Sequence, residues 1–193
     1  MTMEQVEGAT DSERMLLVLD IDETLVFANE QGVAGVVPDA VVGPYKVHKR
    51  PFVDEFIAAM DQQFRLALWT SGSGFWARAI EKMLFAQTAP LDFVWSSNRC
   101  TISRDPIYGH RVSLKDFRKL RRRGYDLRRV LVIDNTAQKH HRNWGNLIHV
   151  KDFEGQQDDI ELRLLMDYIP QIASQPNVRK IDKRTWRTDV RRP

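Results

Sequence analysis

The sequence has little of what secreted, membrane-spanning or disulfide-stapled proteins depend on. Its 193 residues contain a single cysteine, Cys100, so no internal disulfide can form. No stretch approaches the roughly 18 consecutive apolar residues of a membrane span. Residues 1–14 are polar and acidic and contain no apolar segment. We therefore expect neither a secretory signal nor a membrane span, and we expect a cytoplasmic protein, or a nuclear one in a eukaryote.

Internal repeats, low-complexity tracts and linkers rich in proline, glycine and serine are also absent. With 42% hydrophobic and 28% charged residues, the chain has the composition of an ordinary globular domain. A chain of this length buries enough surface to fold without a structural metal. One domain is therefore expected.

The formal net charge of +3 is unevenly distributed. Residues 179–193 hold seven basic and two acidic side chains, a net charge of +5, which leaves −2 for the rest of the chain. A second basic group occupies residues 118–123. Two interpretations stay open: a surface for nucleic acid or an acidic partner, or a solvated helix face and a frayed tail. We favour the second, because charge runs are usually solvated.

Short apolar runs alternate with amphipathic segments along the chain. Apolar runs predict strands at residues 15–20, 65–69, 93–95, 130–134 and 147–150. Apolar residues at helical spacing predict helices at residues 53–62, 76–84 and 162–169, and a capping-box pattern predicts a further helix that begins at Ser113. Residues 100–103 and 108–112 are typical of a small hairpin. The alternation predicts an α/β fold, a Rossmann-like parallel sheet with helices on both faces.

Ligands of such sheets bind beyond the carboxyl ends of the strands. Asp20 and Asp22, Thr70, and Asp134 with Asn135 stand at three of these ends, and Lys115 is placed to reach the same edge. In an extended strand, side chains two residues apart point the same way, so Asp20 and Asp22 need a cation or a proton between them. Carboxylate and amide oxygens are ligands that Mg²⁺ accepts. The strand ends therefore predict a site for a hard divalent cation.

Three other phosphate or metal motifs do not fit. An EF-hand loop that starts at Asp20 would need glycine at Leu25 and glutamate at Gln31. A cysteine phosphatase loop that starts at Cys100 would need arginine at Pro106. The Ser71–Gly74 turn lacks the further glycine or lysine of a P-loop or dinucleotide-binding loop.

Four ordered motifs carry a family resemblance: Asp20–Leu25, Leu68–Ser71, Leu114–Asp116 and Leu131–Thr136. Together they resemble the haloacid dehalogenase (HAD) superfamily. With Lys49–Phe56, they are similar to its NLI-interacting-factor-like branch, the small phosphatases that act on the carboxy-terminal domain of RNA polymerase II and their bacterial relatives. The resemblance implies a flexible N-terminus at residues 1–13, a HAD-like phosphatase domain at 14–172 and a basic tail at 173–193.

The resemblance also implies roles for individual residues. Asp20 would be the nucleophile and Asp22 the general acid and base, while Thr24 braces the loop. Thr70 would donate a hydrogen bond to the phosphoryl group, and Lys115 would neutralise its charge. Magnesium would be held by Asp20, the backbone carbonyl of Asp22, Asp134 and Asn135, with Asp134 as a direct ligand or as support for one.

Expectations for the substrate side concern three residues and a patch. Ser71, Trp76 and Arg99 are candidate substrate contacts, although Trp76 also fits the apolar face of a helix and relatives carry their arginine nearer Ser97. An apolar patch beside the site, or a small packed sheet, is expected from Val33, Val36, Val37 and Val41. His140 and His141 are expected in an exposed turn.

Segments 27–48 and 100–112 are too short for a large cap, which favours a phosphorylated protein or peptide over an enclosed metabolite. We therefore expect a Mg²⁺-dependent phosphoserine or phosphothreonine phosphatase that forms an aspartyl-phosphate. A phosphatase of small phosphomonoesters is the alternative within the same chemistry. A receiver-like phospho-acceptor module is the alternative from another class, and Asp22 argues against it because such a module needs no acid to assist turnover. A binding protein that holds nucleic acid through its basic tail is a third possibility.

Overall fold

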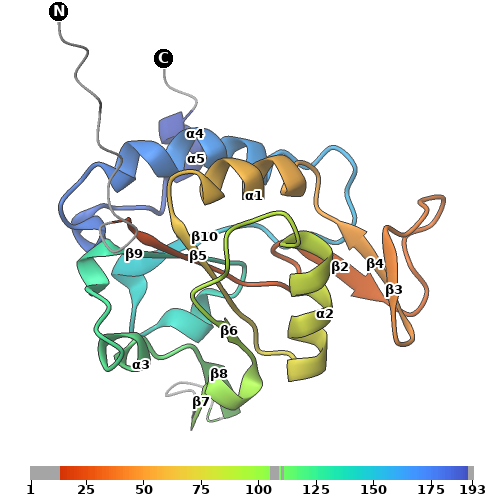
Figure 1. The fold of residues 1–193 in the computed structure, drawn as a ribbon, viewed down its shortest axis with the longest axis horizontal. Helices are drawn as coiled ribbons and strands as arrows, with labels where there is room; N and C mark the ends of the chain where they lie inside the picture. The colour runs from red at the N-terminus through yellow and green to blue at the C-terminus, as the bar shows by residue number, and fades with distance from the viewer. Residues whose placement is uncertain (1–13, 105–108, 110, 191–193) are drawn as a thin grey trace, which may run out of the picture.

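A parallel sheet of five strands forms the centre of the molecule (Figure 1). The computed structural model describes residues 14–104, 109 and 111–190, so the expected flexible N-terminus and part of the expected hairpin lie outside the described residues. The order across the sheet is β10-β9-β1-β5-β6. The strands are β1 (Leu16–Leu19), β5 (Arg65–Trp69), β6 (Val94–Trp95), β9 (Val130–Asp134) and β10 (Leu147–His149). The predicted parallel α/β fold is confirmed.

The strands are recognisable in the sequence because both faces of the sheet are covered, which makes them continuous apolar runs. Alternate residues point to opposite faces. Leu17 and Leu19 of β1 belong to one buried cluster, while Leu16 and Val18 belong to the other. The pairing register aligns Leu19 with Leu68 and with Ile133, so β1, β5 and β9 end together at one edge.

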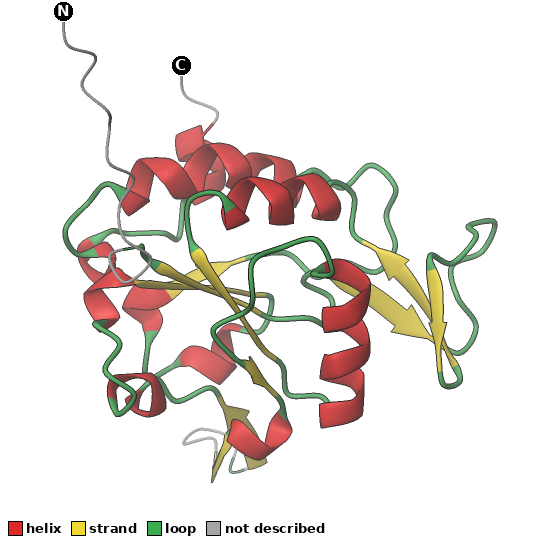
Figure 2. Cartoon of the chain, in the orientation of Figure 1, coloured by secondary structure: helices red, strands yellow, loops and turns green. Residues whose placement is uncertain are grey.

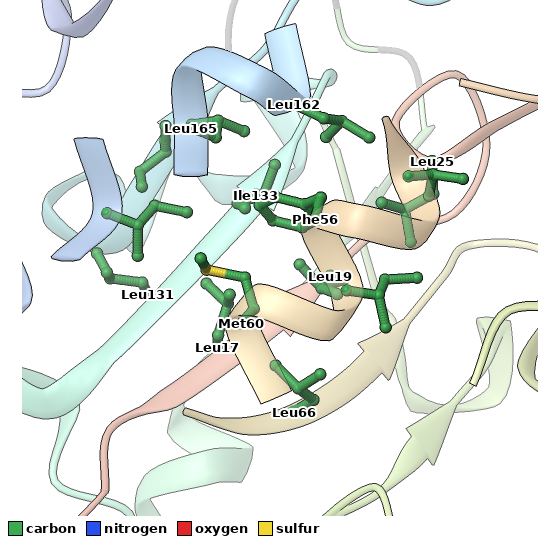
Figure 3. Packing of buried hydrophobic residues seen from close by; sticks show 14 of the residues in the cluster. Leu17, Leu19, Leu25, Phe56, Met60, Leu66, Leu131, Ile133, Leu162 and Leu165 are labelled. Carbon is green, nitrogen blue, oxygen red and sulfur yellow. The ribbon is translucent and has the colours of Figure 1, made fainter. Parts of the chain in front are cut away.

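Most helices cover the first face, as Figure 2 shows. They are α1 (Val53–Asp61), α2 (Gly74–Leu84), α4 (Glu161–Ala173) and α5 (Trp186–Val190). In Figure 3, Phe56 and Met60 of α1 lie close to Ile133 and Leu17 of the sheet, with Leu162 and Leu165 of α4 above them in this view. The second face packs on the short helix α3 (Arg118–Arg121) and neighbouring loops through Phe117 and Leu120. The 3₁₀ turns are η1 (Ser97–Arg99), η2 (Leu127–Arg129), η3 (Ala137–His140), η4 (Trp144–Asn146) and η5 (Val178–Lys180).

Two small antiparallel sheets are added to this core. Strands β2 (Val26–Asn29), β4 (Tyr45–Lys49) and β3 (Ala40–Val42) form one, which projects from the domain beside α2 (Figure 1). Strands β7 (Thr101–Arg104) and β8 (Arg111–Leu114) form the predicted hairpin. The helix predicted from Ser113 is wrong, because Ser113 pairs with Ile102 inside this hairpin and α3 begins at Arg118.

The chain after residue 173 packs on the domain in its described part. Val178 and Trp186 are fully buried members of the core cluster, and Arg187 pairs with Glu161 of α4. The expected frayed tail is therefore wrong as far as residue 190. No helix in the described ranges is long and apolar enough to cross a membrane.

Candidate active site

The strand ends bring most of the predicted site residues together. Asp20 follows β1, Thr70 follows β5 and Asp134 ends β9, and these three strands are neighbours in the sheet. Lys115 arrives from the end of β8. All four side chains are fully buried. Full burial is unusual for the three charged residues, Asp20, Lys115 and Asp134, unless they are paired.

Lys115 bridges the two buried aspartates. Its Nζ lies 2.6 Å from Oδ1 of Asp20 and 2.6 Å from Oδ2 of Asp134. Burial alone would lower the pKa of the Lys115 ammonium, but the Asp134 and Asp20 carboxylates raise it, so the lysine stays charged. One ammonium between two acids leaves negative charge at the sheet edge, where a further cation or a phosphoryl group with its metal is favoured.

The two aspartates differ in their electrostatics. Burial, together with the charge of Asp134, raises the pKa of Asp20 to about 6, although Lys115 and Lys139 act in the opposite direction. Burial also acts to raise the pKa of Asp134, but Lys115 and a hydrogen bond from His140 hold it far below its ordinary value. Asp134 is therefore the fixed charge of the pair, and Asp20 is the more basic carboxylate.

Asp22 is held by different partners. Thr70 Oγ1 donates to its Oδ2 at 2.8 Å, and Trp76 Nε1 donates to its Oδ1 at 2.7 Å. Asp22 lies beyond the end of β1 at Leu19 and directly before Glu23, which has a positive φ of 57°, and its charge still acts to raise the pKa of Asp20. The turn thus gives each carboxylate its own hydrogen-bonding environment.

Asn135 is fixed from several sides. Its amide nitrogen donates to Glu23 and to Asp152, each at 3.0 Å. Its backbone nitrogen donates to Thr24 Oγ1 at 3.2 Å, and His149 Nε2 lies 2.7 Å from its backbone oxygen. Thr24 Oγ1 also lies 3.4 Å from Oδ2 of Asp20, so it braces the loop against the next strand end.

The predicted magnesium ligands supply oxygen donors of the right kind. Carboxylates of Asp20 and Asp134, the amide oxygen of Asn135 and the carbonyl of Asp22 suit a hard cation. The side chains of Asp20, Asp134 and Asn135 are all buried at the same edge of the sheet. The set fits Mg²⁺, which binds through one or two carboxylates and keeps several waters.

Two residues after the third strand end were not found as site residues from the sequence. Lys139 Nζ lies 3.9 Å from Oδ2 of Asp20, and its side chain is 21% exposed. His140 is fully buried, and its Nε2 lies 2.8 Å from Oδ2 of Asp134. The predicted exposed turn is correct for His141 and wrong for His140. Burial lowers the pKa of His140, so the ring is neutral and supports the aspartate. The signal that could have identified Lys139 and His140 as site residues was their position shortly after the Asp134 motif.

The three candidate substrate contacts lie in different surroundings. Ser71 is half-buried, and its hydroxyl has no hydrogen-bond partner among the described residues. Trp76 packs against the core cluster, as its helical position predicted, and its indole nitrogen also donates to Asp22. The Arg99 guanidinium lies over the Trp95 ring, 5.6 Å from its centroid.

An apolar hollow of about 520 Å³ opens beside Asp22. Its walls come from the small sheet and from the start of α2, through Ala28, Val42, Pro44, Tyr45, Phe75 and Trp76. The valines predicted to form this patch, Val33, Val36, Val37 and Val41, do not line it, and Val37 and Val41 are 86% and 65% exposed. Alternation along β3 explains this for Val41, because Val41 and Val42 face opposite ways.

A family model described as NLI interacting factor-like phosphatase matches residues 15–179. The chain belongs to this family. It is 31% identical over 172 residues to the human carboxy-terminal domain RNA polymerase II polypeptide A small phosphatase 1, covering 86% of this chain and 62% of that protein. It is 27% identical over 176 residues to Phosphatase Herzog of Drosophila melanogaster, covering 88% and 47%. The chain thus spans less than two thirds of the length of these relatives.

Solved structures show the same fold. The fission yeast RNA polymerase II CTD phosphatase Fcp1 bound to beryllium fluoride aligns with a TM-score of 0.53 at 21% identity, covering 73% of this chain and 42% of that chain. A second Fcp1 structure aligns with a TM-score of 0.54 at 16% identity, covering 92% and 61%. The predicted membership of this HAD branch is confirmed, and the family name agrees with the expected class of phosphoric monoester hydrolases.

Proposed function

We propose that the chain is a Mg²⁺-dependent phosphoprotein phosphatase that acts on phosphoserine or phosphothreonine through an aspartyl-phosphate at Asp20. The observation that supports this proposal is that the carboxylates of Asp20 and Asp22 have different surroundings. Asp20 is buried and bound by Lys115, while Asp22 is only partly buried, is bound by Thr70 and Trp76, and borders the apolar hollow. Asp20 is thus suited to attack phosphorus, and Asp22 is suited to transfer protons.

In the first step, a carboxylate oxygen of Asp20 attacks phosphorus. The bond from phosphorus to the seryl or threonyl oxygen breaks, and the protonated Asp22 gives its proton to that oxygen. The Thr70 and Trp76 hydrogen bonds hold the Asp22 carboxyl in place for this transfer. In the second step, Asp22 takes a proton from water as the water oxygen attacks phosphorus. The acyl-phosphate bond then breaks, which releases phosphate and restores both carboxyl groups.

Positive charge must accompany the phosphoryl group through both steps. Lys115 supplies one fixed charge, and Lys139, with its Nζ 3.9 Å from Asp20, supplies a second that is open to solvent. When bound, Mg²⁺ would be held by Asp20, the Asp22 carbonyl, Asn135 and Asp134, and would polarise the phosphoryl oxygens. The acidic surroundings of Lys115 explain why added positive charge is favoured here.

The apolar hollow favours a peptide over a small metabolite. It lies directly beside Asp22 and accepts an apolar side chain next to the phosphorylated residue. The names of the relatives state action on RNA polymerase II polypeptide A, a protein, in agreement with this choice. A phosphatase of small phosphomonoesters would use the same carboxylates but would not need this hollow.

The test measures phosphate release from p-nitrophenyl phosphate and a phosphopeptide panel, with and without Mg²⁺. We expect Mg²⁺-dependent turnover, loss of at least about a thousandfold in Asp20→Asn and Asp22→Asn, and no change in Asp54→Asn, a matched exposed aspartate on α1. Peptides with an apolar neighbour should be preferred. Equal turnover of small esters and peptides favours the phosphomonoesterase alternative.

A receiver-like acceptor gives a different result. Wild-type protein would then release no phosphate, and a stable phosphoryl group would accumulate on Asp20 from an acyl phosphate donor. Mass spectrometry of the phosphorylated protein separates this outcome from rapid turnover.

A further inference from the structure

A polar hollow of about 450 Å³ adjoins Gly74, at the end of the loop that begins at Thr70. It is bounded by the start of α2 and by β6 with the η1 turn that follows. Its lining includes three arginines and several polar groups, among them Arg78, Ser96, Asn98, Arg99 and Arg123. One member of the basic group at residues 118–123 thus faces a defined hollow.

Two of these arginines are held against one aromatic ring. The guanidinium carbons of Arg99 and Arg123 lie 5.6 Å and 5.2 Å from the centroid of the buried Trp95. Lys119 Nζ donates to the backbone oxygen of Arg99 at 2.6 Å, which fixes the turn. Stacking on a rigid ring restricts both side chains before any ligand binds, and this lowers the entropic cost of binding.

Arg78 pairs with Glu81 at 2.7 Å, but the charges of Arg99 and Arg123 are not neutralised by the acid of the hollow. Asp92 lines the hollow, but Arg65 Nε donates to it at 3.1 Å and Tyr125 Oη at 2.8 Å. No carboxylate in the described part of the chain pairs with Arg99 or Arg123. Two unpaired guanidiniums that line one hollow favour an anion there, and a phosphate dianion suits the donor geometry of arginine.

The hollow is close to Asp22. A Cβ added to Gly72 would lie 3.6 Å from Oδ2 of Asp22, and one added to Gly74 would lie 3.6 Å from the Ser96 hydroxyl. These two glycines are two residues apart, a span of at most about 7 Å. Ser97 N also donates to the Gly72 oxygen at 2.9 Å, which joins the walls of the two sites. An extended peptide rises about 3.3 Å per residue, so a few residues bridge them.

We propose that this arginine hollow binds a second phosphate group on the phosphopeptide substrate, about two to four residues from the phosphate that is hydrolysed. The inference rests on the proposed phosphatase function and adds a specificity site to it. The apolar hollow, which is lined by Gly72 and Ser73, and the arginine hollow, which is lined by Gly74, then both border the loop that begins at Thr70.

The test compares singly phosphorylated peptides with the same peptides carrying a second phosphoserine at each position from two to four residues away, on either side. At low ionic strength, we expect the best doubly phosphorylated peptide to have a kcat/KM about tenfold higher, mainly through a lower KM. The ratio between the two peptides should fall to about one in the Arg99→Ala, Arg123→Ala double variant. Arg121→Ala, at an exposed arginine that ends α3 and lies outside the hollow, should keep the ratio.

A ratio of one in the wild-type protein, or an unchanged ratio in the double variant, overturns the proposal. Peptide binding to the Asp20→Asn variant, followed by fluorescence anisotropy, tests the hollow without turnover. If no substrate is hydrolysed but this variant binds the doubly phosphorylated peptide through Arg99 and Arg123, the proposed function fails and the anion site stands. Equal displacement of the singly and doubly phosphorylated peptides by a single-stranded RNA would instead indicate a general polyanion surface, and the proposal fails.

Discussion

At the scale of single residues, Asp20 is held in surroundings that oppose its own charge. Burial and the neighbouring Asp134 raise its pKa to about 6 from an ordinary value of 3.8. A carboxyl whose pKa is raised by folding contributes stability below about pH 4, and this contribution is lost as the pH rises through about 6. The metal-free protein therefore gives up stability at neutral pH to keep an ionised nucleophile.

Asp20→Asn should accordingly be inactive yet more stable than wild type. In the presence of a chelator at pH 7.5, we expect the free energy of unfolding of Asp20→Asn to be about 1 to 3 kcal/mol higher than that of wild type. The substitution removes the buried charge of Asp20, while Lys115 keeps its ion pair with Asp134. This gain in the free energy of unfolding should disappear near pH 4, where Asp20 of the wild-type protein is protonated in the folded and the unfolded state. Urea unfolding at the two pH values measures both differences. A variant that is less stable at pH 7.5 would show that the Lys115 ion pair outweighs the burial of Asp20.

At the scale of secondary-structure elements, the β5–α2 loop positions most of the groups around Asp22. Thr70 begins the loop, Ser73 caps α2 by accepting from Trp76 N at 3.1 Å, and Trp76 reaches back to Asp22. A Cβ on Gly72 would lie 2.9 Å from Cδ1 of Trp76 and 3.3 Å from Oγ1 of Thr70. Glycine at this position therefore permits both hydrogen bonds to Asp22.

Gly72→Ala should displace Trp76 and Thr70 and lower kcat for p-nitrophenyl phosphate by about tenfold or more, because small misplacements of reacting groups are costly. Gly74→Ala is the matched control, since the nearest atom to its added Cβ would be 3.6 Å away. Thermal unfolding should change little in either variant. Equal kinetics for Gly72→Ala and wild type would mean that the Asp22 hydrogen bonds do not limit the reaction.

Elements with buried surroundings were predictable from the sequence, and elements on the surface were not. The strands Arg65–Trp69 and Val130–Asp134 match their predicted bounds, because a run buried on both faces leaves a continuous apolar signal. The sheet of β2, β4 and β3 leaves no such signal, since its side chains are largely half-buried or exposed. The capping pattern at Ser113 does not start a helix, because the predicted hairpin continues through Leu114 and pairs Ser113 with Ile102.

The candidate site divides in the same way. The strand ends placed Asp20, Thr70 and Asp134 correctly, because parallel strands in register end at one edge. The roles of Lys139 and His140 depend on a 3₁₀ turn that folds back over that edge. Helical and strand periodicities carry no information about such a turn, so basic neighbours made His140 resemble a surface residue.

At the scale of the whole molecule, the C-terminal segment contributes to the core rather than only to charge. Trp186 is fully buried against Tyr168 of α4, with ring centroids 5.7 Å apart, and its Nε1 donates to the His149 oxygen at 2.9 Å. Lys183 is also buried and donates to the oxygens of Val178 and Ile181, and burial lowers its pKa to about 8. Deletion of residues 179–193 would therefore damage the fold and is a poor test of nucleic-acid binding.

Trp186→Ala should destabilise the protein by about 3 to 5 kcal/mol, because it opens a large cavity and removes one of the donors to the His149 oxygen, which keeps Arg187 Nη2 at 3.2 Å. Trp144→Ala, at a tryptophan that is 56% exposed, is the matched control and should change the free energy of unfolding by less than about 1 kcal/mol. Urea unfolding followed by circular dichroism measures both. Since His149 lies between Trp186 and Asn135, the Trp186 variant should also weaken Mg²⁺ binding at a temperature where it remains folded. Similar stabilities for the two variants would instead mean that the segment after residue 173 is only loosely attached to the phosphatase domain.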